Sequence, residues 1–200
     1  MGIHRAIAAA AWALASIVVS AHAAHSQEVK LADVEGMTVA TEITLDQLVE
    51  REGMKRSVKI HQVWKVSVGE KKAIDFTMDS TARGPGGTRK AKQIVASLDL
   101  DEPRQTASRG GGEALWTFAD GALTFVRTLP SGAYRMHIAF ARAPDGLTCT
   151  VTGAFARENG TGRIRLLSPF SGEWTTILSA KQVASSCKVS RTAAAGAAQR

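Results

Sequence analysis

The chain has 200 residues, of which 44% are hydrophobic and 22% charged, with a formal net charge of +7 and two cysteines. This composition fits about one globular domain, and it excludes a collagen, a coiled coil, a wholly disordered chain and a polytopic membrane protein. Two cysteines are too few for a disulfide-rich scaffold or a four-cysteine zinc site.

Residues 1–23 have the three parts of a secretory signal. His4 and Arg5 form a basic start, residues 6–19 are uncharged and apolar, and small residues precede a possible cut after Ala23. As a helix the apolar run spans about 21 Å, short of the roughly 30 Å of a bilayer core, which favours a cleaved signal over an anchor. The sequence predicts export to the periplasm or beyond, with cleavage near Ala23 and a flexible segment over residues 24–36.

The next segment predicts a strand, a helix and a second strand. Residues 37–43 are typical of a strand, and Thr44 then opens a capping-box pattern with Gln47. This pattern predicts one short helix over residues 45–53. Residues 57–68 alternate between apolar and polar side chains, as a half-buried strand does.

A three-residue turn at residues 69–71 would pair residues 57–68 with a strand beyond the turn. That register sets Trp64 opposite Phe76, and His61 opposite Asp79 on the polar face. Residues 93–100 predict another strand. The glycine- and proline-containing stretches 80–92 and 101–112, on either side of it, predict mobile loops.

From residue 113 onward, turn signals recur every 8 to 12 residues between alternating segments, which is typical of antiparallel hairpins. The four turns are expected at Asp120-Gly121, Ser131-Gly132, residues 143–146 and Asn159-Gly160. Each turn keeps one face apolar. The expected pairs are Phe118–Leu123, Trp116–Phe125, Phe125–Ile138, Leu123–Phe140, Phe140–Cys149, Ile138–Val151 and Phe155–Ile164.

These elements predict an all-β fold: an antiparallel meander of about 8–10 strands over residues 37–190, forming a small barrel or a two-sheet sandwich. An alanine-rich tail, residues 191–200, is expected to be disordered. In an exported protein, Cys149 and Cys187 predict one structural disulfide. Closing that loop would stabilise the fold by about 4 kcal/mol on the chain-entropy model.

No catalytic residue, metal site or cofactor is assigned from the sequence, because no nucleophile elbow, zinc helix or phosphate-binding loop is present. His61 opposite Asp79 could act as an oriented base, but such a pair on a sheet face is more often a solvated contact. His137 alternates with buried positions and is expected to face water. The acidic run Asp99, Asp101 and Glu102 is interpreted as a charged strand end.

Positive charge is concentrated over residues 51–92. A basic region of this kind steers anionic partners, which for an exported protein include anionic lipid, lipopolysaccharide and acidic polysaccharide. Nucleic acid is disfavoured because the polar faces carry no interleaved aromatic side chains. The candidate anion-binding residues are Arg56, Lys59, Lys65, Arg83, Arg89, Lys90 and Lys92.

Three functions remain open from the sequence. The first is a non-catalytic exported β-domain that binds anionic envelope components through its basic surface. The second is a lipocalin-like carrier of a small apolar ligand, with Trp64, Trp116 and Phe125 lining a cavity in place of a solid core. The third is a hydrolase or lyase with an unrecognised site. The oligomeric state is left open.

Overall fold

The computed structural model describes residues 28–106, 112–157 and 163–191, and strands make up most of these residues. The signal predicted at residues 1–23, the Asn159-Gly160 turn and residues 192–200 lie outside the described residues. The elements in chain order are α1 (Leu31–Val34), β1 (Met37–Arg51), β2 (Met54–Val68), the 3-10 turn η1 (Glu70–Lys72), β3 (Ala73–Gly84), β4 (Gly87–Lys90), β5 (Ile94–Asp99), β6 (Arg104–Gln105), β7 (Glu113–Ala119), β8 (Ala122–Leu129), β9 (Gly132–Ala143), β10 (Gly146–Arg157), β11 (Ile164–Leu167) and β12 (Trp174–Arg191).

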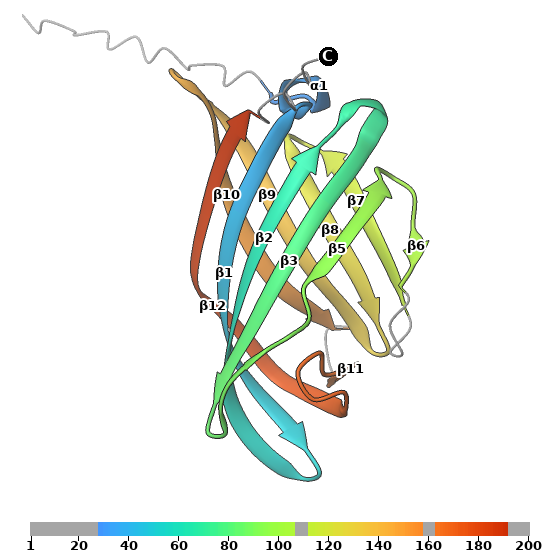
Figure 1. Ribbon diagram of the computed structural model, residues 1–200, viewed down its shortest axis with the longest axis vertical. Helices are drawn as coiled ribbons and strands as arrows, with labels where there is room; N and C mark the ends of the chain where they lie inside the picture. Colours follow the sequence, from blue (N-terminus) through green and yellow to red (C-terminus); the bar gives the residue numbers. More distant parts are fainter. Residues whose placement is uncertain (1–27, 107–111, 158–162, 192–200) are drawn as a thin grey trace, which may run out of the picture.

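The strands form two curled antiparallel sheets around one interior, which confirms the predicted all-β fold (Figure 1). One sheet has the order β11-β12-β1-β2-β3-β4, with β5 also paired to β3. The other has the order β10-β9-β8-β7-β6. The sheets approach each other along β10 and β12, and a bridge between Leu100 and Trp116 links them on the other side.

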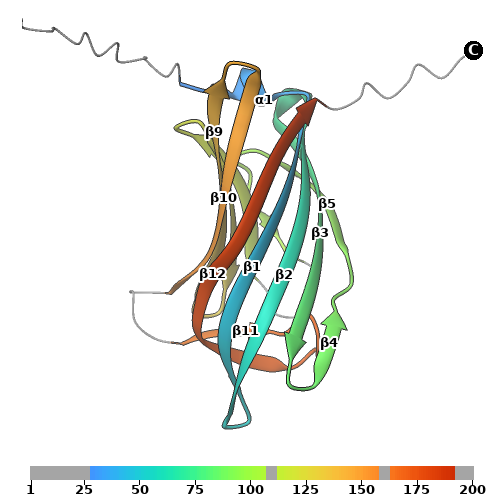
Figure 2. The ribbon, with the colours of Figure 1, turned by 90° about the vertical axis from the view of Figure 1, so that its left-hand side faces the viewer.

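The molecule has two distinct ends (Figure 2). The helix end carries α1 together with the turns at residues 69–72, 120–121 and 144–145. The opposite end carries β11 and the tight turns that join β1 to β2 and β3 to β4. It is called the cavity end below.

An aromatic cluster fills the interior of the half nearer the helix end. Trp64 contacts Phe76, Phe125 and Tyr134 at ring-centroid distances of 5.8, 5.3 and 6.4 Å. Trp116, which is fully buried, lies 5.1 Å from Phe125. These rings come from both sheets, so the cluster holds the two sheets together by burial of large apolar surfaces.

The helix predicted over residues 45–53 is wrong, because those residues continue β1 to Arg51. Leu45 and Gln47 alternate with exposed or half-buried neighbours and point inward. Because the inward residue Gln47 is polar, the apolar residues here do not alternate every two residues, and their spacing resembles that of a helix. Pairing with β2 on one edge and with β12 on the other overrides the local capping signal.

Two hairpin registers differ from the prediction by two residues. The turn after β2 is longer than expected, so Trp64 lies opposite Met78 and His61 opposite Thr81. The turn after β8 is shifted, so Phe125 pairs with Met136 and Leu123 with Ile138. A shift of two residues keeps the same side chains inward, which is why the predicted core survives.

The remaining turns divide into confirmed and corrected predictions. Asp120 and Gly121 have positive φ angles of 50° and 70° and pair Trp116 with Phe125, as predicted. The pairs across residues 143–146 are also confirmed. By contrast, Ile164 pairs with Ile177 of β12 and not with Phe155, because β11 returns to the larger sheet.

The loop expected over residues 80–92 is wrong for residues 80–90. These residues complete β3 and form β4, which pair with each other across a tight turn at Pro85 and Gly86. In the second expected loop, Arg104 and Gln105 form the short strand β6.

The predicted disulfide is present between Cys149 of β10 and Cys187 of β12. Beside it, the Gln182 side chain accepts a hydrogen bond from the Gly153 N–H at 2.6 Å and donates one to the Val151 carbonyl at 3.2 Å. These contacts join the facing edges of the two sheets where a regular strand ladder does not.

Candidate functional site

The half of the interior nearer the cavity end holds a cavity of about 510 Å³. This volume is within the range of roughly 300–1,000 Å³ that small-molecule sites occupy. The wall is mainly apolar and comes from both sheets. It includes Val58, Ile60, Met78, Tyr134, Phe155 and Phe170.

Small side chains on β3 create the space. Ser80 and Ala82 are buried and line the cavity, whereas Ile74 and Phe76 occupy equivalent inward positions of β3 nearer the helix end. Because a strand directs alternate residues to the same face, this one strand fills one half of the interior and leaves the other open.

The inner end of the cavity is formed by a polar contact that lies between the cavity and the aromatic cluster. The Tyr134 hydroxyl donates a hydrogen bond to Gln62 Oε1 at 2.7 Å, and the Trp64 indole N–H donates to the same oxygen at 3.4 Å. Burial raises the pKa of the Tyr134 hydroxyl, so this group stays a proton donor. The contact holds Tyr134 in the cavity wall and Trp64 behind it.

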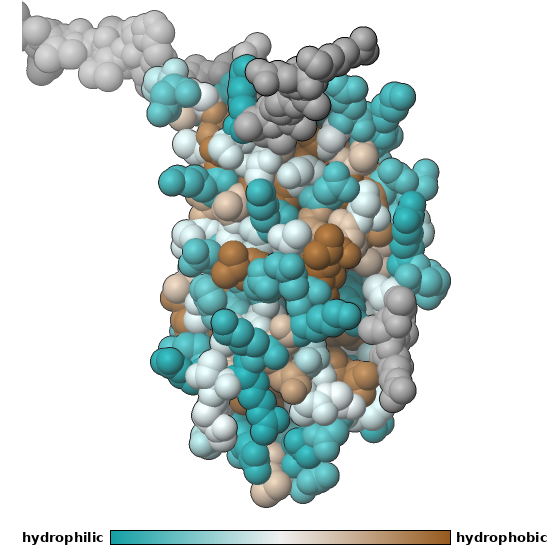
Figure 3. Space-filling model, viewed as in Figure 1, coloured by the Kyte–Doolittle hydropathy of each residue, from teal (hydrophilic) through white to brown (hydrophobic). Residues whose placement is uncertain are grey.

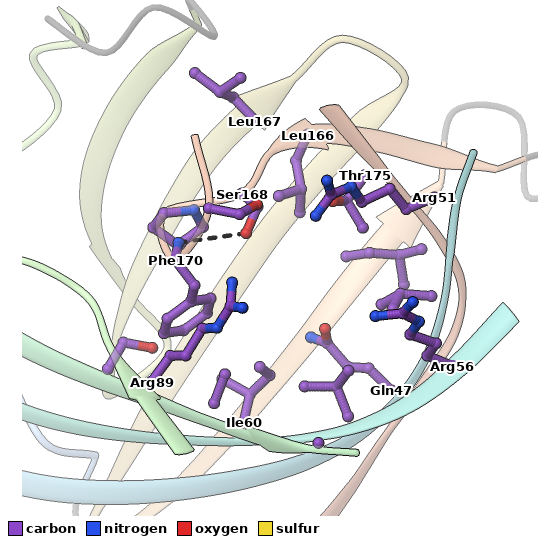
Figure 4. Close-up of a pocket in the computed structure, with 18 of the residues that line it drawn as sticks. Gln47, Arg51, Arg56, Ile60, Arg89, Leu166, Leu167, Ser168, Phe170 and Thr175 are labelled. Carbon is purple, nitrogen blue, oxygen red and sulfur yellow. Dashed lines mark hydrogen bonds between the residues drawn. The ribbon is translucent and has the colours of Figure 1, made fainter. Parts of the chain in front are cut away.

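Arginine side chains surround the outer part of the cavity. Figure 4 shows Arg51, Arg56 and Arg89 reaching toward it from β1, β2 and β4. Arg127, which is half-buried on β8, also lines the cavity, and desolvation lowers the pKa of its guanidinium. Arginine remains charged in proteins even so. Glu52 is the one acidic residue among the described residues that line the cavity.

The segment that contains β11 closes one side of the cavity. The Ser131 hydroxyl donates a hydrogen bond to the Arg163 carbonyl at 2.7 Å and accepts one from the Arg165 N–H at 2.8 Å. At the other end of the segment, Arg51 and Glu173 form an ion pair at 2.5 Å. These contacts place Phe170 against the cavity (Figure 4).

The structure separates the candidate anion-binding residues into two groups. Arg56 and Arg89 line the cavity. Lys59 and Arg83 instead lie opposite each other on β2 and β3 and line a shallow depression on the outer surface. The other members, Lys65, Lys90 and Lys92, are on strands or a connection outside the cavity wall, and all three are exposed.

Trp64, Trp116 and Phe125 lie in the aromatic cluster, and none of the three is part of the cavity wall. Trp64 reaches the cavity only through Gln62 and Tyr134. Apart from Arg56 and Arg89, the cavity lining is not predicted from the sequence, in part because Gln47, Gln62 and Ser80 are polar residues at inward positions. Their signal in the sequence is a polar or small residue that interrupts an apolar face near the end of a strand.

The residues considered for catalysis are apart or already paired. Asp79 accepts a hydrogen bond from Gln93 at 2.8 Å, whereas His61 contacts Thr44 at 3.2 Å, so the predicted His61–Asp79 pair does not form. His137 is exposed, as expected, and contacts Thr124 at 2.9 Å.

The acidic run is engaged by nearby cations at the helix end. Asp99 pairs with Arg104 at 3.5 Å and Asp101 with Lys72 at 3.7 Å. In the described part of the chain, no three histidine, cysteine or acidic side chains gather as a metal site would require.

Comparison with protein families, curated proteins and solved structures finds no match to this chain. Within residues 28–106, 112–157 and 163–191, no helix has the length and hydrophobicity to cross a membrane. The cavity is therefore the feature of this chain that bears most directly on function.

Proposed function

We propose that this protein binds a long-chain amphiphilic anion, with the apolar chain in the cavity and the anionic group at the arginines of the outer part. The observation that carries the proposal is the pairing of an apolar wall with Arg51, Arg56 and Arg89 around one opening. It unites the two binding functions that the sequence leaves open.

The wall favours an apolar chain because burying its surface releases water from both partners. Ile60, Ala82 and Ile177 are buried residues of this wall, and they come from β2, β3 and β12. The cavity is therefore already formed, and little conformational entropy would be lost on binding.

The arginines favour an anionic head group. A guanidinium donates paired hydrogen bonds to a carboxylate or phosphate, and an apolar surrounding strengthens the attraction. Glu173 already engages Arg51, whereas Arg56 and Arg89 form no ion pair with a described carboxylate. Arg56 and Arg89 are thus the residues we assign to the head group.

We further propose that the protein acts after export and signal cleavage near Ala23. The Cys149–Cys187 disulfide supports this, because disulfides form and persist in oxidising compartments. Expression in a secreting bacterium followed by intact-mass measurement would give a chain that lacks residues 1–23 if this is right. A full-length mass in the exported fraction would contradict it.

The binding proposal is tested by titrating the protein with dansylated undecanoic acid and following the dansyl fluorescence. The double variant Arg56→Ala/Arg89→Ala should bind this probe at least about tenfold more weakly, since each lost charge-assisted hydrogen bond is worth about 1.5–3 kcal/mol. Lys59→Ala/Arg83→Ala removes the same charge from the outer surface and is the matched control.

The control variant should bind the probe as the unmodified protein does. Equal weakening in both double variants would mean that net charge alone attracts the probe. Full affinity in Arg56→Ala/Arg89→Ala, or no probe binding by the unmodified protein, would overturn the assignment of this cavity.

A further inference from the structure

The two ends of the molecule carry opposite charge. Several cations toward the cavity end form no ion pair with a described carboxylate; they include Lys55, Arg56, Arg83, Arg89, Lys90 and Arg165. At the helix end, six carboxylates form no ion pair with a described cation: Glu28, Glu35, Glu70, Glu102, Asp120 and Asp145. Residues of the other sign also lack an ion pair with a described residue: Glu52 and Glu113 lie toward the cavity end, and Lys30, Lys71, Lys188 and Arg191 lie toward the helix end, where the six carboxylates still outnumber these cations.

The cavity end also exposes large apolar side chains among these cations. Met54, the first residue of β2, is 50% exposed, and Trp174, at the start of β12, is 41% exposed. The Arg165 guanidinium lies 5.0 Å from the centre of the Trp174 ring. Tryptophan beside arginine suits the boundary between lipid tails and head groups. The indole has an apolar body and a polar N–H, and the guanidinium can contact an anionic head group.

Most of the surface seen in Figure 3 is hydrophilic, and its apolar residues are scattered. Met54 and Trp174 differ from such scattered residues by their place beside the cavity. Met54 lines the cavity, and Trp174 precedes the lining residue Thr175.

We propose that the cavity end docks on an anionic lipid bilayer, so that the cavity opens against the membrane. This inference rests on the proposed function and names the source of its ligand: an amphiphile that leaves the bilayer through the opening without crossing water. The opposite charges of the two ends orient the approach, because the acidic helix end is repelled by the surface that attracts the cavity end.

The test measures binding to vesicles of phosphatidylglycerol and phosphatidylcholine, compared with vesicles of phosphatidylcholine alone. Lys55→Glu/Lys90→Glu reverses two charges at the cavity end outside the cavity wall. Lys65→Glu/Lys71→Glu makes the same change in charge in the half nearer the helix end. The first variant should bind anionic vesicles at least about tenfold more weakly, since each basic residue near such a surface contributes about 1 kcal/mol.

The orientation is read from quenching of Trp174 by brominated lipid tails. The unmodified protein should show a quenched component that disappears in Trp174→Phe. Attachment through the apolar residues 6–19 would instead bring the opposite end to the membrane, because the described chain begins at Glu28 beside α1. Absence of Trp174-dependent quenching therefore overturns the proposal.

Other outcomes overturn it as well. Equal loss of vesicle binding in both double variants would leave net charge as the cause, and binding to an acidic polysaccharide without binding to anionic vesicles would give this surface a different partner. Binding of dansylated undecanoic acid without vesicles separates the two proposals. If the probe binds but the protein does not bind anionic vesicles, only the docking proposal is overturned. If the protein binds vesicles but not the probe, the proposed function is overturned.

Discussion

The two halves of the interior are built by the same strands and have opposite properties. Nearer the helix end, β3 contributes Ile74 and Phe76, and the interior is filled by aromatic rings. Nearer the cavity end, the same strand contributes Ser80 and Ala82, and a cavity remains. The difference shows that side-chain volume along one strand can leave one half of a β-fold solidly packed and the other half hollow.

The contacts that close the structure follow the same division. The disulfide and the Asp33–Arg142 ion pair, at 2.7 Å, lie toward the helix end. The cavity end is held by the tight turns and by the few contacts of β11. We therefore expect changes near the helix end to affect folding and changes near the cavity end to affect ligand binding.

The largest effect on stability is expected from opening the contact between β10 and β12. Replacing Cys149 and Cys187 by serine removes a cross-link across 38 residues, which should lower the free energy of unfolding by about 4 kcal/mol. Urea denaturation of the variant and of the unmodified protein with and without reductant would measure this. An unchanged transition midpoint in the variant would contradict the stabilising role of the disulfide.

A pair of leucine truncations compares the two halves directly. Leu123 is fully buried in the filled half, so Leu123→Ala should cost about 2–5 kcal/mol of unfolding free energy. Leu166 is half-buried at the cavity, and Leu166→Ala should cost less than about 1 kcal/mol because the methyl groups already face open space. Equal losses in thermal or urea unfolding would show that the two halves are not differently packed.

Much of this fold can be predicted from the sequence, because turn chemistry and apolar alternation agree over residues 113–157. The positive φ angles at Asp120 and Gly121 are what an Asp-Gly turn requires, and a two-residue error in register leaves the inward face unchanged. The helix prediction at residues 45–53 fails for the opposite reason. A capping pattern reflects only neighbouring residues, whereas β1 is held by pairing with two strands distant in the sequence, β2 and β12.

The candidate site is much harder to predict. A cavity forms where side-chain volume is missing. Ser80 and Ala82 belong to no sequence motif that distinguishes a cavity wall from a loosely packed core. Arg56 and Arg89 do stand out as basic residues, but their separation from Lys59 and Arg83 depends on which face of the sheet each occupies. For Arg83 and Arg89 the sequence indicates no face, because residues 80–92 are predicted as a loop and not as the strands β3 and β4.

Obstructing the cavity should weaken ligand binding and spare the fold. Ala82→Phe places a ring in the cavity and should weaken binding of dansylated undecanoic acid at least about tenfold, because the ring occupies part of the space that the chain would fill. Ala154→Phe adds the same ring at an exposed position of β10 and serves as the control. Isothermal titration that finds equal affinity in both variants would place the binding site elsewhere.

The smallest expected effect concerns pH and the helix end. The Lys30 backbone N–H and the Arg142 guanidinium hold the pKa of Asp33 below its ordinary value. A carboxyl group with a lowered pKa in the folded state stabilises that state above its unfolded pKa and loses the effect as pH falls through the folded value.

Asp33→Asn should therefore lower the unfolding temperature slightly at neutral pH and leave it unchanged in strong acid, because an exposed ion pair contributes little. Binding of the probe should be unaffected, since Asp33 lies at the end away from the cavity. A difference from the unmodified protein that persists at the lowest pH would assign the effect to something other than the charge of Asp33.

The central claim is that the anionic group of the ligand lies between Arg56 and Arg89. Carbon-13 NMR of a bound fatty acid labelled at its carboxyl carbon tests this most directly, because the chemical shift follows ionisation of that group alone. In the unmodified protein and in Lys59→Ala/Arg83→Ala, nearby guanidinium groups should lower the pKa of the bound carboxyl. In Arg56→Ala/Arg89→Ala, the pKa of that carboxyl should be higher. An identical carboxyl pKa in all three proteins would contradict the account.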